Sequence, residues 1–410
     1  MLDIKFIRQN PDKVKEGLQK KGVNPKIIDR LLELDEERRS RIRSTESLVA
    51  EQKKFGRDNI EEARNIKEKI IKIAPDLERI EKEFQVLMFQ VPNLPLEDVP
   101  VGKDESDNVV LREVGKKPKF SFKPKDYLEI AENLDLIDVK RAAKVSGSRF
   151  GYLKREAALL EFALINFAFD TLTKKGFIPV IPPVMIKPEM ARGMGYPEQF
   201  GGEEAYYLEK DNLYLEGTTE QVIGPMHADE VFEEKDLPRR YVGFSTWFRR
   251  EAGSYGKDTR GIFRSHQFDG VEMFSFCQPE NSQKEHQFFL EREEALINAL
   301  KIPYRVLRIC TGDLGFPAVA KYDIEAWLPS EGRYRETHST STCTDFQARR
   351  LNIRYRTKQG LEFVHTLNGT AFAIGRMLIA IIENYQQKDG SIEIPKVLQK
   401  YTGFKKIGSK

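Results

Sequence analysis

One stretch, FRREAGSYGKDTRGIFRSHQFDGVEMF, combines the residue types that bind a nucleotide, because two arginine-bearing, strand-like runs flank a glycine-rich loop. Side chains alternate between the faces of a strand, so Arg249 and Glu251 share one face of the first run. Arg264, Phe268 and Glu272 share one face of the second run in the same way. Guanidinium groups bind phosphate, aromatic rings stack on bases and carboxylates accept hydrogen bonds from amines. If the two runs pair as a hairpin, one surface can hold each part of an aminoacyl adenylate.

The alternative interpretation of this stretch is an exposed hairpin whose Arg and Glu side chains form weak ion pairs across the strands. A lone FRxE tetrapeptide is typical of such a hairpin. The whole stretch, however, resembles motif 2 of the class II aminoacyl-tRNA synthetases, in the form found in the seryl-tRNA synthetase family. That form reads FRxEAG, then GxDTRG, then RxHQFxKVE, and Gly270 stands here where the family usually has Lys.

A second run, YRETHSTSTCTDFQARR, crowds hydroxyl groups next to Glu336. Hard oxygen ligands of this kind suit Mg²⁺ bridged to phosphates, although a hydroxyl-rich turn is the simpler interpretation. The run resembles RExSSCSNCxDFQARR of the seryl enzymes, which implies that Glu336 binds ATP and the metal and that Ser339 is the second ligand on the metal side. These two residues are three apart, so a local bend must bring them to one face. His338 and Thr342 depart from the usual Ser and Asn.

A third run, HTLNGTAFAIGRMLIAIIENYQ, places Gly375 and Arg376 at the start of an almost continuously apolar helix. A helix that is apolar on every side is buried, and a guanidinium there costs several kcal/mol unless an anion pairs with it. A phosphate partner is therefore favoured. The run resembles motif 3, whose Arg binds the γ-phosphate of ATP, with Thr370 in place of the usual Ser of LNGS.

Two weaker resemblances complete the set. The run KGFIPVIPPVMI resembles motif 1, the dimer-interface element of class II enzymes, with Pro183 at its usual proline. Thr218, Thr219 and Glu220 match the TxE triplet that seryl enzymes use near the substrate amino group, although such a triplet is frequent in ordinary strands and turns.

Composition limits the class of protein. A chain of 410 residues has room for two or three domains. Lys and Arg total 67 against 64 Asp and Glu, which favours local basic surfaces over a generally basic protein. Three scattered cysteines and five histidines show no disulfide framework and no zinc spacing, which fits a reducing cytosol. The apolar segment 369–382 contains Arg376, and no apolar signal core is present, so neither secretion nor membrane insertion is expected.

The N-terminal region predicts helices. Asn-Pro pairs at 10–11 and 24–25 are typical helix starts. Within 60–89 the apolar residues alternate spacings of four and three, as in a coiled coil: Ile66, Ile70, Ile73, Leu77, Ile80, Phe84 and Leu87. The preceding segment, about 25–55, is less regular because Asp35 and Arg38 interrupt its apolar positions.

A turn at 56–59 would make the two segments an antiparallel hairpin, and this arrangement resembles the arm that seryl enzymes extend to the long variable arm of tRNA. Basic residues along the arm could contact phosphates, although a solvated face explains any single one: Arg38, Arg39, Arg41, Arg43, Lys53, Lys54 and Arg57.

The predicted organisation is a tRNA-binding arm over 1–100 with its coiled coil at about 25–90, a proline-rich linker over 101–125 and a catalytic domain over 126–410. Helical patterns such as 153–175 and alternating strands such as 304–309 and 322–328 indicate an α+β fold. The resemblance implies a class II domain built on a mostly antiparallel sheet flanked by helices.

The resemblance also implies a function: a cytoplasmic, homodimeric seryl-tRNA synthetase that uses ATP and Mg²⁺ to convert L-serine to seryl adenylate. The seryl group then passes to tRNA(Ser), and to tRNA(Sec) where present. The implied catalytic residues are Arg249 and Arg376. The implied ATP-binding residues are Arg249, Glu251, Arg264, Phe268, Glu336, Ser339 and Arg376, and the implied serine-binding residues are Thr218, Thr219, Glu220, Arg249, Glu272 and Thr370.

Two other functions remain open at this point. A paralogue could aminoacylate a carrier protein or small molecule, but it would be expected to lack the arm. A non-catalytic RNA-binding homologue would be expected to have lost its phosphate-binding arginines, and Arg249, Arg264 and Arg376 are all present.

Overall fold

A computed structural model describes residues 1–55, 59–196, 204–252 and 260–408. The chain divides into two compact units, Met1–Leu94 and Pro95–Lys410. Most of the turn expected at 56–59, together with Arg57 and most of the GxDTRG loop, lies outside the described residues.

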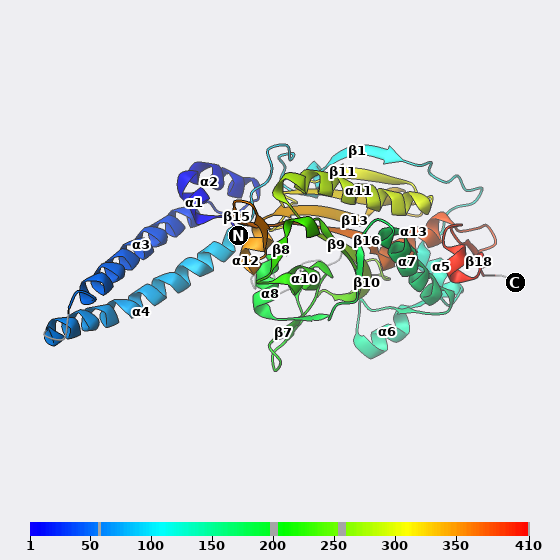
Figure 1. The fold of residues 1–410 in the computed structure, drawn as a ribbon. Coiled ribbons are helices and arrows are strands. Elements are labelled where there is room, and N and C mark those ends of the chain that lie inside the picture. The colour runs from blue at the N-terminus through cyan, green and yellow to red at the C-terminus, as the bar shows by residue number, and fades with distance from the viewer. Residues whose placement is uncertain (56–58, 197–203, 253–259, 409–410) are drawn as a thin grey trace. The chain divides into compact units, whose positions relative to one another are not determined.

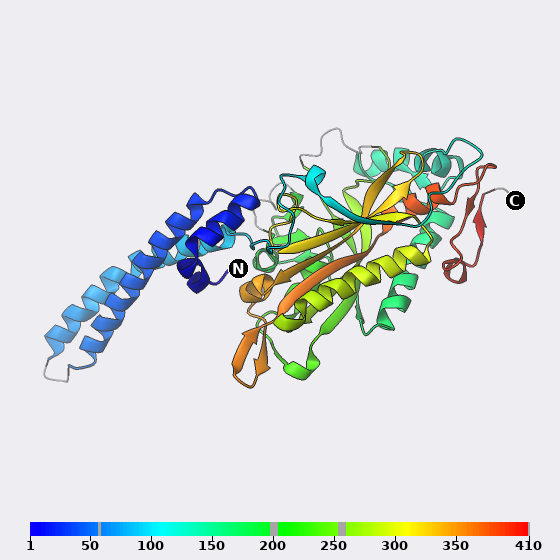
Figure 2. The same ribbon diagram turned by 90° about the horizontal axis from the view of Figure 1, so that it is seen from above.

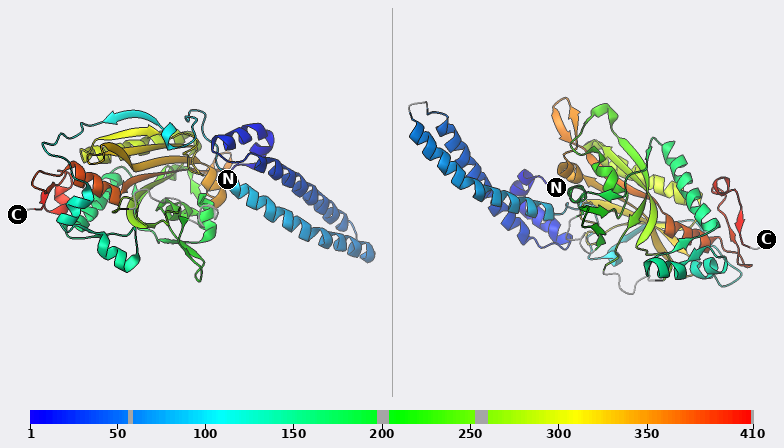
Figure 3. Two further views of the ribbon diagram at one scale, coloured as in Figure 1. Left: turned by 180° about the vertical axis from the view of Figure 1, so that it is seen from behind. Right: turned by 90° about the horizontal axis from the view of Figure 1, so that it is seen from below.

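The smaller unit is helical. Two short helices precede a long pair that lies side by side, as Figures 1 and 3 show. Helix α2 begins with Pro11 directly after Asn10, as the sequence predicts. The second expected start is shifted by one residue, because Pro25 caps the helix and the Oδ1 of Asn24 accepts from the N–H of Lys26 at 3.0 Å. The helices are α1 (Ile4–Gln9), α2 (Pro11–Lys20), α3 (Lys26–Gln52) and α4 (Ile60–Gln90).

The predicted seam forms the contact between α3 and α4. Ile66, Ile80 and Phe84 are at most 5% exposed, and Leu31 of α3 is fully buried. Asp35, which interrupts the apolar pattern, is itself buried. Its Oδ2 lies 3.1 Å from Nε of Arg8 and 3.0 Å from Nε of Arg39. A carboxylate is tolerated in this seam because two guanidinium groups neutralise it.

The larger unit is built on an eight-stranded sheet with the order β1-β11-β12-β13-β16-β10-β9-β4. Its pairs are antiparallel except for β4 beside β9. The strands are β1 (Val109–Val114), β4 (Ile178–Val180), β9 (Arg239–Phe248), β10 (Gln267–Cys277), β11 (Tyr304–Arg308), β12 (Ala320–Leu328), β13 (Arg333–Thr344) and β16 (His365–Ala373).

Long helices cover one face of this sheet. Figure 2 shows α11 running along strands β13 and β16. Alternate strand residues such as Val271 and Met273 point toward the helices and join Leu164, Phe289 and Ile381 in one buried apolar cluster. The helices that pack on the sheet are α7 (Glu156–Thr173), α11 (Ser282–Ala299) and α13 (Ile374–Asn384). Because side chains alternate, the residues between those core positions face the other side of the sheet, where polar groups can collect.

Short elements surround the sheet. The remaining helices are α5 (Tyr127–Asn133), α6 (Val139–Ser146), α8 (Pro188–Met194), α10 (Glu220–Ile223), α12 (Phe346–Leu351) and α14 (Gln399–Thr402). The small sheets pair β2 (Ile137–Asp138) with β3 (Tyr152–Leu153), β17 (Ile392–Glu393) with β18 (Lys406–Ile407), β7 (Leu213–Leu215) with β5 (Met185–Ile186) and β6 (Tyr207–Leu208), and β14 (Arg354–Thr357) with β8 (Val231–Glu233) and β15 (Gly360–Phe363).

The structure confirms the predicted fold class, with a helical arm and a mostly antiparallel sheet flanked by helices. It differs in the segment 101–125, where an irregular linker was expected. Residues Val109–Val114 form the edge strand β1, which pairs with β11. Most residues of this strand are exposed on both faces, so the sequence VVLREV does not alternate between apolar and polar residues. Backbone hydrogen bonds, rather than side-chain burial, hold the segment in the sheet. Among the described residues, no helix is both long enough and apolar enough to cross a membrane.

Asp35→Ala should destabilise the arm by about 2 kcal/mol, because it removes the charged acceptor shared by two arginines. Chemical unfolding of the full chain, followed by circular dichroism, measures the change. Glu78→Ala is the matched control, since Glu78 forms an exposed pair with Lys82 and its loss should change little. Equal stability of the two variants would contradict the role given to Asp35.

Candidate active site

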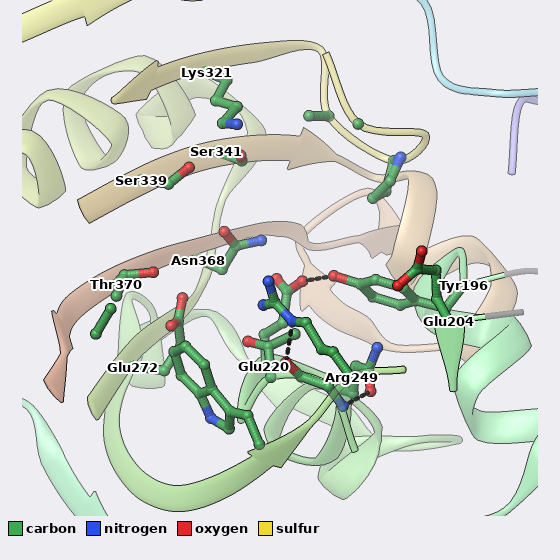
Figure 4. A pocket seen from close by; sticks show the side chains of 18 of the residues that line it. Tyr196, Glu204, Glu220, Arg249, Glu272, Lys321, Ser339, Ser341, Asn368 and Thr370 are labelled. Atoms are coloured by element: carbon green, nitrogen blue, oxygen red, sulfur yellow. Dashed lines mark hydrogen bonds between the residues drawn. The ribbon is translucent and has the colours of Figure 1, made fainter. Parts of the chain in front are cut away.

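A cavity of about 550 Å³ opens on the face of the sheet opposite α7, α11 and α13. Strands β9, β10, β12, β13 and β16 contribute to its walls, together with the segments around α10 and the loop after β11. The polar and aromatic residues that line it include Tyr196, Glu204, Thr218, Glu220, Gln221, Trp247, Phe248, Arg249, Phe268, Glu272, Phe316, Lys321, Glu336, Thr337, Ser339, Ser341, Asn368, Thr370 and Arg376, and Figure 4 shows part of this set.

The hairpin predicted from the motif 2 stretch is formed by β9 and β10. Phe268 and Glu272 lie on the same strand four residues apart and both line the cavity, as alternation requires. Arg249 follows the end of β9, and its Nε donates to the backbone oxygen of Gly217 at 3.0 Å. Its guanidinium carbon lies 5.3 Å from the centre of the Phe268 ring. A cation and an aromatic ring therefore meet at one end of the cavity.

Glu251 and Arg264 do not line the cavity, and the face argument made for them is wrong. Strand β9 ends at Phe248 and β10 begins at Gln267, so both residues lie outside the two strands. Glu251 has a left-handed φ of 51°, which breaks the alternation. The carboxylate of Glu251 instead accepts from Nη1 of Arg264 at 3.0 Å. The two side chains form a pair beside the cavity.

A bulge in β13 brings Glu336 and Ser339 into the cavity together. The pairing with β12 shifts between Ile324, opposite His338, and Glu325, opposite Glu336. The extra residue changes the alternation, so two side chains three positions apart reach one face. The bend that the sequence requires is present.

Arg376 and Glu336 form an ion pair in this cavity. Arg376 lies in the first turn of α13, and its Nη1 is 3.2 Å from Oε1 of Glu336 and donates to the backbone oxygen of Glu336 at 3.1 Å. Partial desolvation raises the pKa of Glu336, whose side chain is 46% exposed, but the charges of Arg376, Lys321 and Arg249 outweigh this effect and lower that pKa below its usual value. The burial expected for Arg376 is only partial, since its side chain is 22% exposed, and the guanidinium has an anionic partner within the chain.

Two buried carboxyl groups, Glu220 and Glu272, line the cavity close enough to Arg249 for its charge to act on both. Glu272 stands opposite Thr370 on β16, and both line the wall. Burial raises the pKa of Glu272 well above its usual value, and the nearby charge of Glu220 raises it further. Glu220 accepts a hydrogen bond from the hydroxyl of Tyr196, drawn in Figure 4, and burial raises its pKa too. Glu216, just outside the wall, has a pKa of about 7 because it is fully buried.

Thr218 lines the cavity but Thr219 does not. The hydroxyl of Thr219 points away, to Ser245 at 2.6 Å and to Nε1 of Trp247 at 2.7 Å. Thr219 therefore supports the turn between Thr218 and Glu220 from behind.

Several lining residues were missed by the sequence analysis, including Tyr196, Trp247, Asn368 and Lys321. Lys321 is 3.3 Å from Oδ2 of Asp323, whose pKa burial raises to about 7. Lys321 and Asp323 are two apart on β12, opposite Ser341 and Ser339, so the strand pattern contained a signal for one shared face. Tyr196 comes from a different segment, and only the folded chain places it here.

Two of the four departures from the family pattern face away from the cavity. His338 contacts the ring of Phe372 on the helix side, and burial lowers its pKa to about 3. Thr342 lies 3.2 Å from the hydroxyl of Ser282 in α11. Gly270 and Thr370 lie on the cavity side of the sheet. Gly270 is on the same strand face as Phe268 and Glu272, and Thr370 lines the wall.

The cavity combines two kinds of chemistry. Its arginines and aromatic ring suit a nucleotide and its phosphates. Its carboxyl groups with raised pKa favour a cationic ligand, because the charge of that ligand would stabilise their ionised forms. Within the described residues, no group of three or more His, Cys, Asp or Glu side chains could hold a metal ion by itself.

Comparisons with known proteins agree with this geometry. Residues 1–95 match the model of the seryl-tRNA synthetase N-terminal domain, and residues 206–385 match that of the tRNA synthetase class II core domain (G, H, P, S and T). The serine–tRNA ligase of Dictyoglomus turgidum is 46% identical over all of both chains. The crystal structure of seryl-tRNA synthetase from Pyrococcus horikoshii complexed with ATP superposes with a TM-score of 0.94 at 43% identity, covering all of both chains. The crystal structure of the cytoplasmic serine–tRNA ligase of Naegleria fowleri in complex with AMP superposes with a TM-score of 0.91 at 34% identity, covering 100% of this chain and 99% of that chain.

Glu216→Gln should remove part of the pH dependence of stability. In the wild-type chain the unfolded state ionises Glu216 near its usual pKa, whereas the folded state keeps the proton up to about pH 7. The folded state thus binds more protons in this window, and stability falls as pH rises through it. Relative to wild type, the variant should gain roughly 3 kcal/mol between pH 4.5 and pH 7.5.

Chemical unfolding at several pH values measures the difference between the two chains. Glu209→Gln, at an exposed position, is the control and should follow the wild-type pH profile. A Glu216→Gln profile parallel to that of wild type would contradict the assignment of a neutral, buried carboxyl.

Proposed function

The chain belongs to the seryl-tRNA synthetase family of class II aminoacyl-tRNA synthetases, and we propose that it is a serine–tRNA ligase that uses ATP. The observation that carries this proposal is the placement of phosphate-binding and ammonium-binding groups in one cavity. We assign Arg249 and Arg376 to the nucleotide and Glu220 and Glu272 to the amino acid, and all four line the cavity. A ligand that bridges the two pairs is an amino acid next to a nucleotide phosphate.

The nucleotide would lie against Phe268, whose ring would stack on the adenine. Arg249 would contact the α-phosphate and the carboxylate of serine, and Arg376 would contact the γ-phosphate. The ion pair of Arg376 with Glu336 supports this assignment, because it shows a guanidinium directed at an anion inside the cavity. Glu251 and Arg264 complete the proposed set of ATP ligands. On ATP binding their ion pair would break, so that Glu251 contacts the adenine edge and Arg264 contacts a phosphate.

Serine would occupy the carboxyl-rich end. Glu220 would accept from the ammonium group, with Thr218 beside it and Thr219 behind the turn. Glu272 and Thr370, directly opposite each other, would bind the hydroxyl or the ammonium group. Alanine would leave these buried polar groups unpaired, which explains how a small amino acid could be selected. Threonine would instead be rejected by size.

Mg²⁺ fits Glu336 and Ser339. The side chain of Glu336 lines the cavity, is 46% exposed and keeps a pKa below its usual value, and Ser339 adds a hydroxyl oxygen on the same face. Two protein oxygens leave the other coordination positions to phosphates and water, the arrangement that this ion prefers. When bound, Mg²⁺ would neutralise charge on the phosphates.

The first reaction needs no protein nucleophile. The carboxylate oxygen of serine attacks the α-phosphorus of ATP, the bond to the bridging oxygen breaks and pyrophosphate leaves. Arg249 and Arg376 orient the reactants and stabilise the developing charge. In the second reaction a hydroxyl of the terminal ribose of tRNA(Ser) attacks the carbonyl carbon of seryl adenylate, and AMP leaves. Use of tRNA(Sec), where it is present, would follow from the same chemistry.

The proposed assembly is a cytoplasmic homodimer. Its helical arm over 1–100 binds tRNA, and a linker over 101–125 joins the arm to the catalytic domain over 126–410. Exposed apolar side chains on α7 and around β4 support a dimer contact through the motif 1 region: Leu159, Phe162, Ile178 and Ile181 are 43–70% exposed. Arg41 and Arg43 of α3 are at least half exposed, which supports phosphate contacts by the arm. No observation favours the carrier-protein or non-catalytic alternatives.

The deciding experiment is amino-acid-dependent exchange of pyrophosphate into ATP, run with serine, threonine, alanine and glycine beside charging of total tRNA. Exchange with serine alone, together with charging, is expected. Exchange without charging would replace the proposal with a paralogue that aminoacylates a carrier protein or small molecule. Absence of exchange would indicate a non-catalytic homologue.

Arg376→Ala should reduce serine-dependent exchange by at least 100-fold, because it removes a cation from the leaving phosphates. Analytical ultracentrifugation should show the same oligomeric state as wild type. Arg333→Ala, whose side chain is 62% exposed and lies outside the cavity, is the control and should keep full exchange. Full activity of Arg376→Ala would remove the assignment to the γ-phosphate.

A further inference from the structure

Trp247 occupies a central position in the cavity that the proposed mechanism does not use. It lies on β9 directly opposite Phe268 and is 3% exposed. Its ring packs edge to face against Phe268, with centres 5.4 Å apart and planes at 80°. The guanidinium carbon of Arg249 lies 5.8 Å from the indole. The indole therefore contacts the aromatic side chain of the nucleotide end.

The indole lies over Gly270. A Cβ at position 270 would stand 2.1 Å from Cζ2 of Trp247 and 2.4 Å from both Cε2 and Cη2. Distances this short cannot be relieved by a small shift, because the ring is rigid and packed in the interior. Trp247 therefore fills the space where a side chain at 270 would begin, and the Lys usual in the family could not fit beneath it.

The other edge of the indole contacts the amino-acid end. Its Nε1 donates to Oγ1 of Thr219 at 2.7 Å, and the same oxygen lies 2.6 Å from the hydroxyl of Ser245. Thr219 is the middle residue of the turn whose neighbours, Thr218 and Glu220, line the cavity. One rigid side chain thus spans from the ring that faces the nucleotide to the turn that faces the amino acid.

We propose that Trp247 is a positioning residue that holds the Thr218–Glu220 turn and the Phe268 ring in register, and that it can do so only because residue 270 is glycine. The inference rests on the proposed function and adds to it. Removing the Nε1–H donor should loosen the turn and weaken serine binding most. Adding a Cβ at 270 should displace the whole indole and weaken both substrates.

The test uses the full-length enzyme and serine-dependent pyrophosphate exchange. Trp247→Phe keeps a ring but loses the donor, and should raise KM for serine about 10-fold while changing KM for ATP less than about threefold. Gly270→Ala should raise both KM values about 10-fold or more. Trp247→Ala combined with Gly270→Ala should be less impaired than the product of the two single effects, since the clash disappears with the indole.

Fluorescence tests the geometry independently of activity. The chain has two tryptophans, and Trp327→Phe leaves Trp247 as the only one. Trp327 packs against Tyr334 outside the cavity, so this substitution should not change exchange. In that background Gly270→Ala should shift the emission to longer wavelength, because the displaced indole becomes more exposed to water.

The outcomes separate the inference from the function. If wild type exchanges pyrophosphate and Gly270→Ala keeps both KM values within twofold, the inference is overturned and the function stands. Multiplicative effects in the double variant would also overturn it. If Gly270→Ala does not fold, Trp247→Phe decides alone, and an unchanged KM for serine rejects the positioning role. If wild type shows no exchange, the proposed function fails, and an unshifted emission spectrum would reject the steric pair as well.

Discussion

The two faces of one antiparallel sheet must meet opposite demands, and the alternation of side chains along β10 and β16 satisfies both. Val271 and Met273 pack against helices, whereas Phe268 and Glu272, one residue out of phase, face a polar cavity. A slip of one residue would bury a carboxyl in the helix layer and expose the apolar core. The thick layer of α7, α11 and α13 fixes the register of these strands, and that register fixes the positions of the site residues.

Bulges adjust this register where the chemistry requires it. The extra residue in β13 turns Glu336 to the same face as Ser339, and a shift between β10 and β16 separates Phe372 on the helix side from Thr370 in the cavity. Each bulge disrupts some of the hydrogen bonds between its two strands. In a wide sheet the remaining strand pairs keep the sheet intact despite this local loss. The charged end of the cavity depends on these local irregularities as much as on the regular strands.

The fold and site follow from the sequence where local patterns determine them. The heptad spacing of Ile66 and Ile80 indicates their helix and its buried seam, and alternation in β10 predicts that Phe268 and Glu272 share a face. The positions of residues were harder to predict from the sequence where several segments of the chain meet. Strand β1 shows no alternation because it is an exposed edge, and Glu251 leaves its expected face through a single left-handed residue. Tyr196, just after a short helix, and Lys321, on a strand, both reach the cavity, but nothing in their local sequence indicates that the two segments meet there.

The contact between Trp247 and Gly270 also constrains the order in which this chain could have changed during evolution. In a chain with any side chain at 270, tryptophan at 247 would have to leave its present place, because the Cβ would overlap the indole there. Glycine first, with a smaller residue at 247, leaves only a gap, and a gap in a cavity wall is tolerated far better than an overlap. Glycine first is therefore the less costly order for reaching the present pair. The reverse change is costly in the same way, since a side chain at 270 displaces the indole for as long as the tryptophan remains.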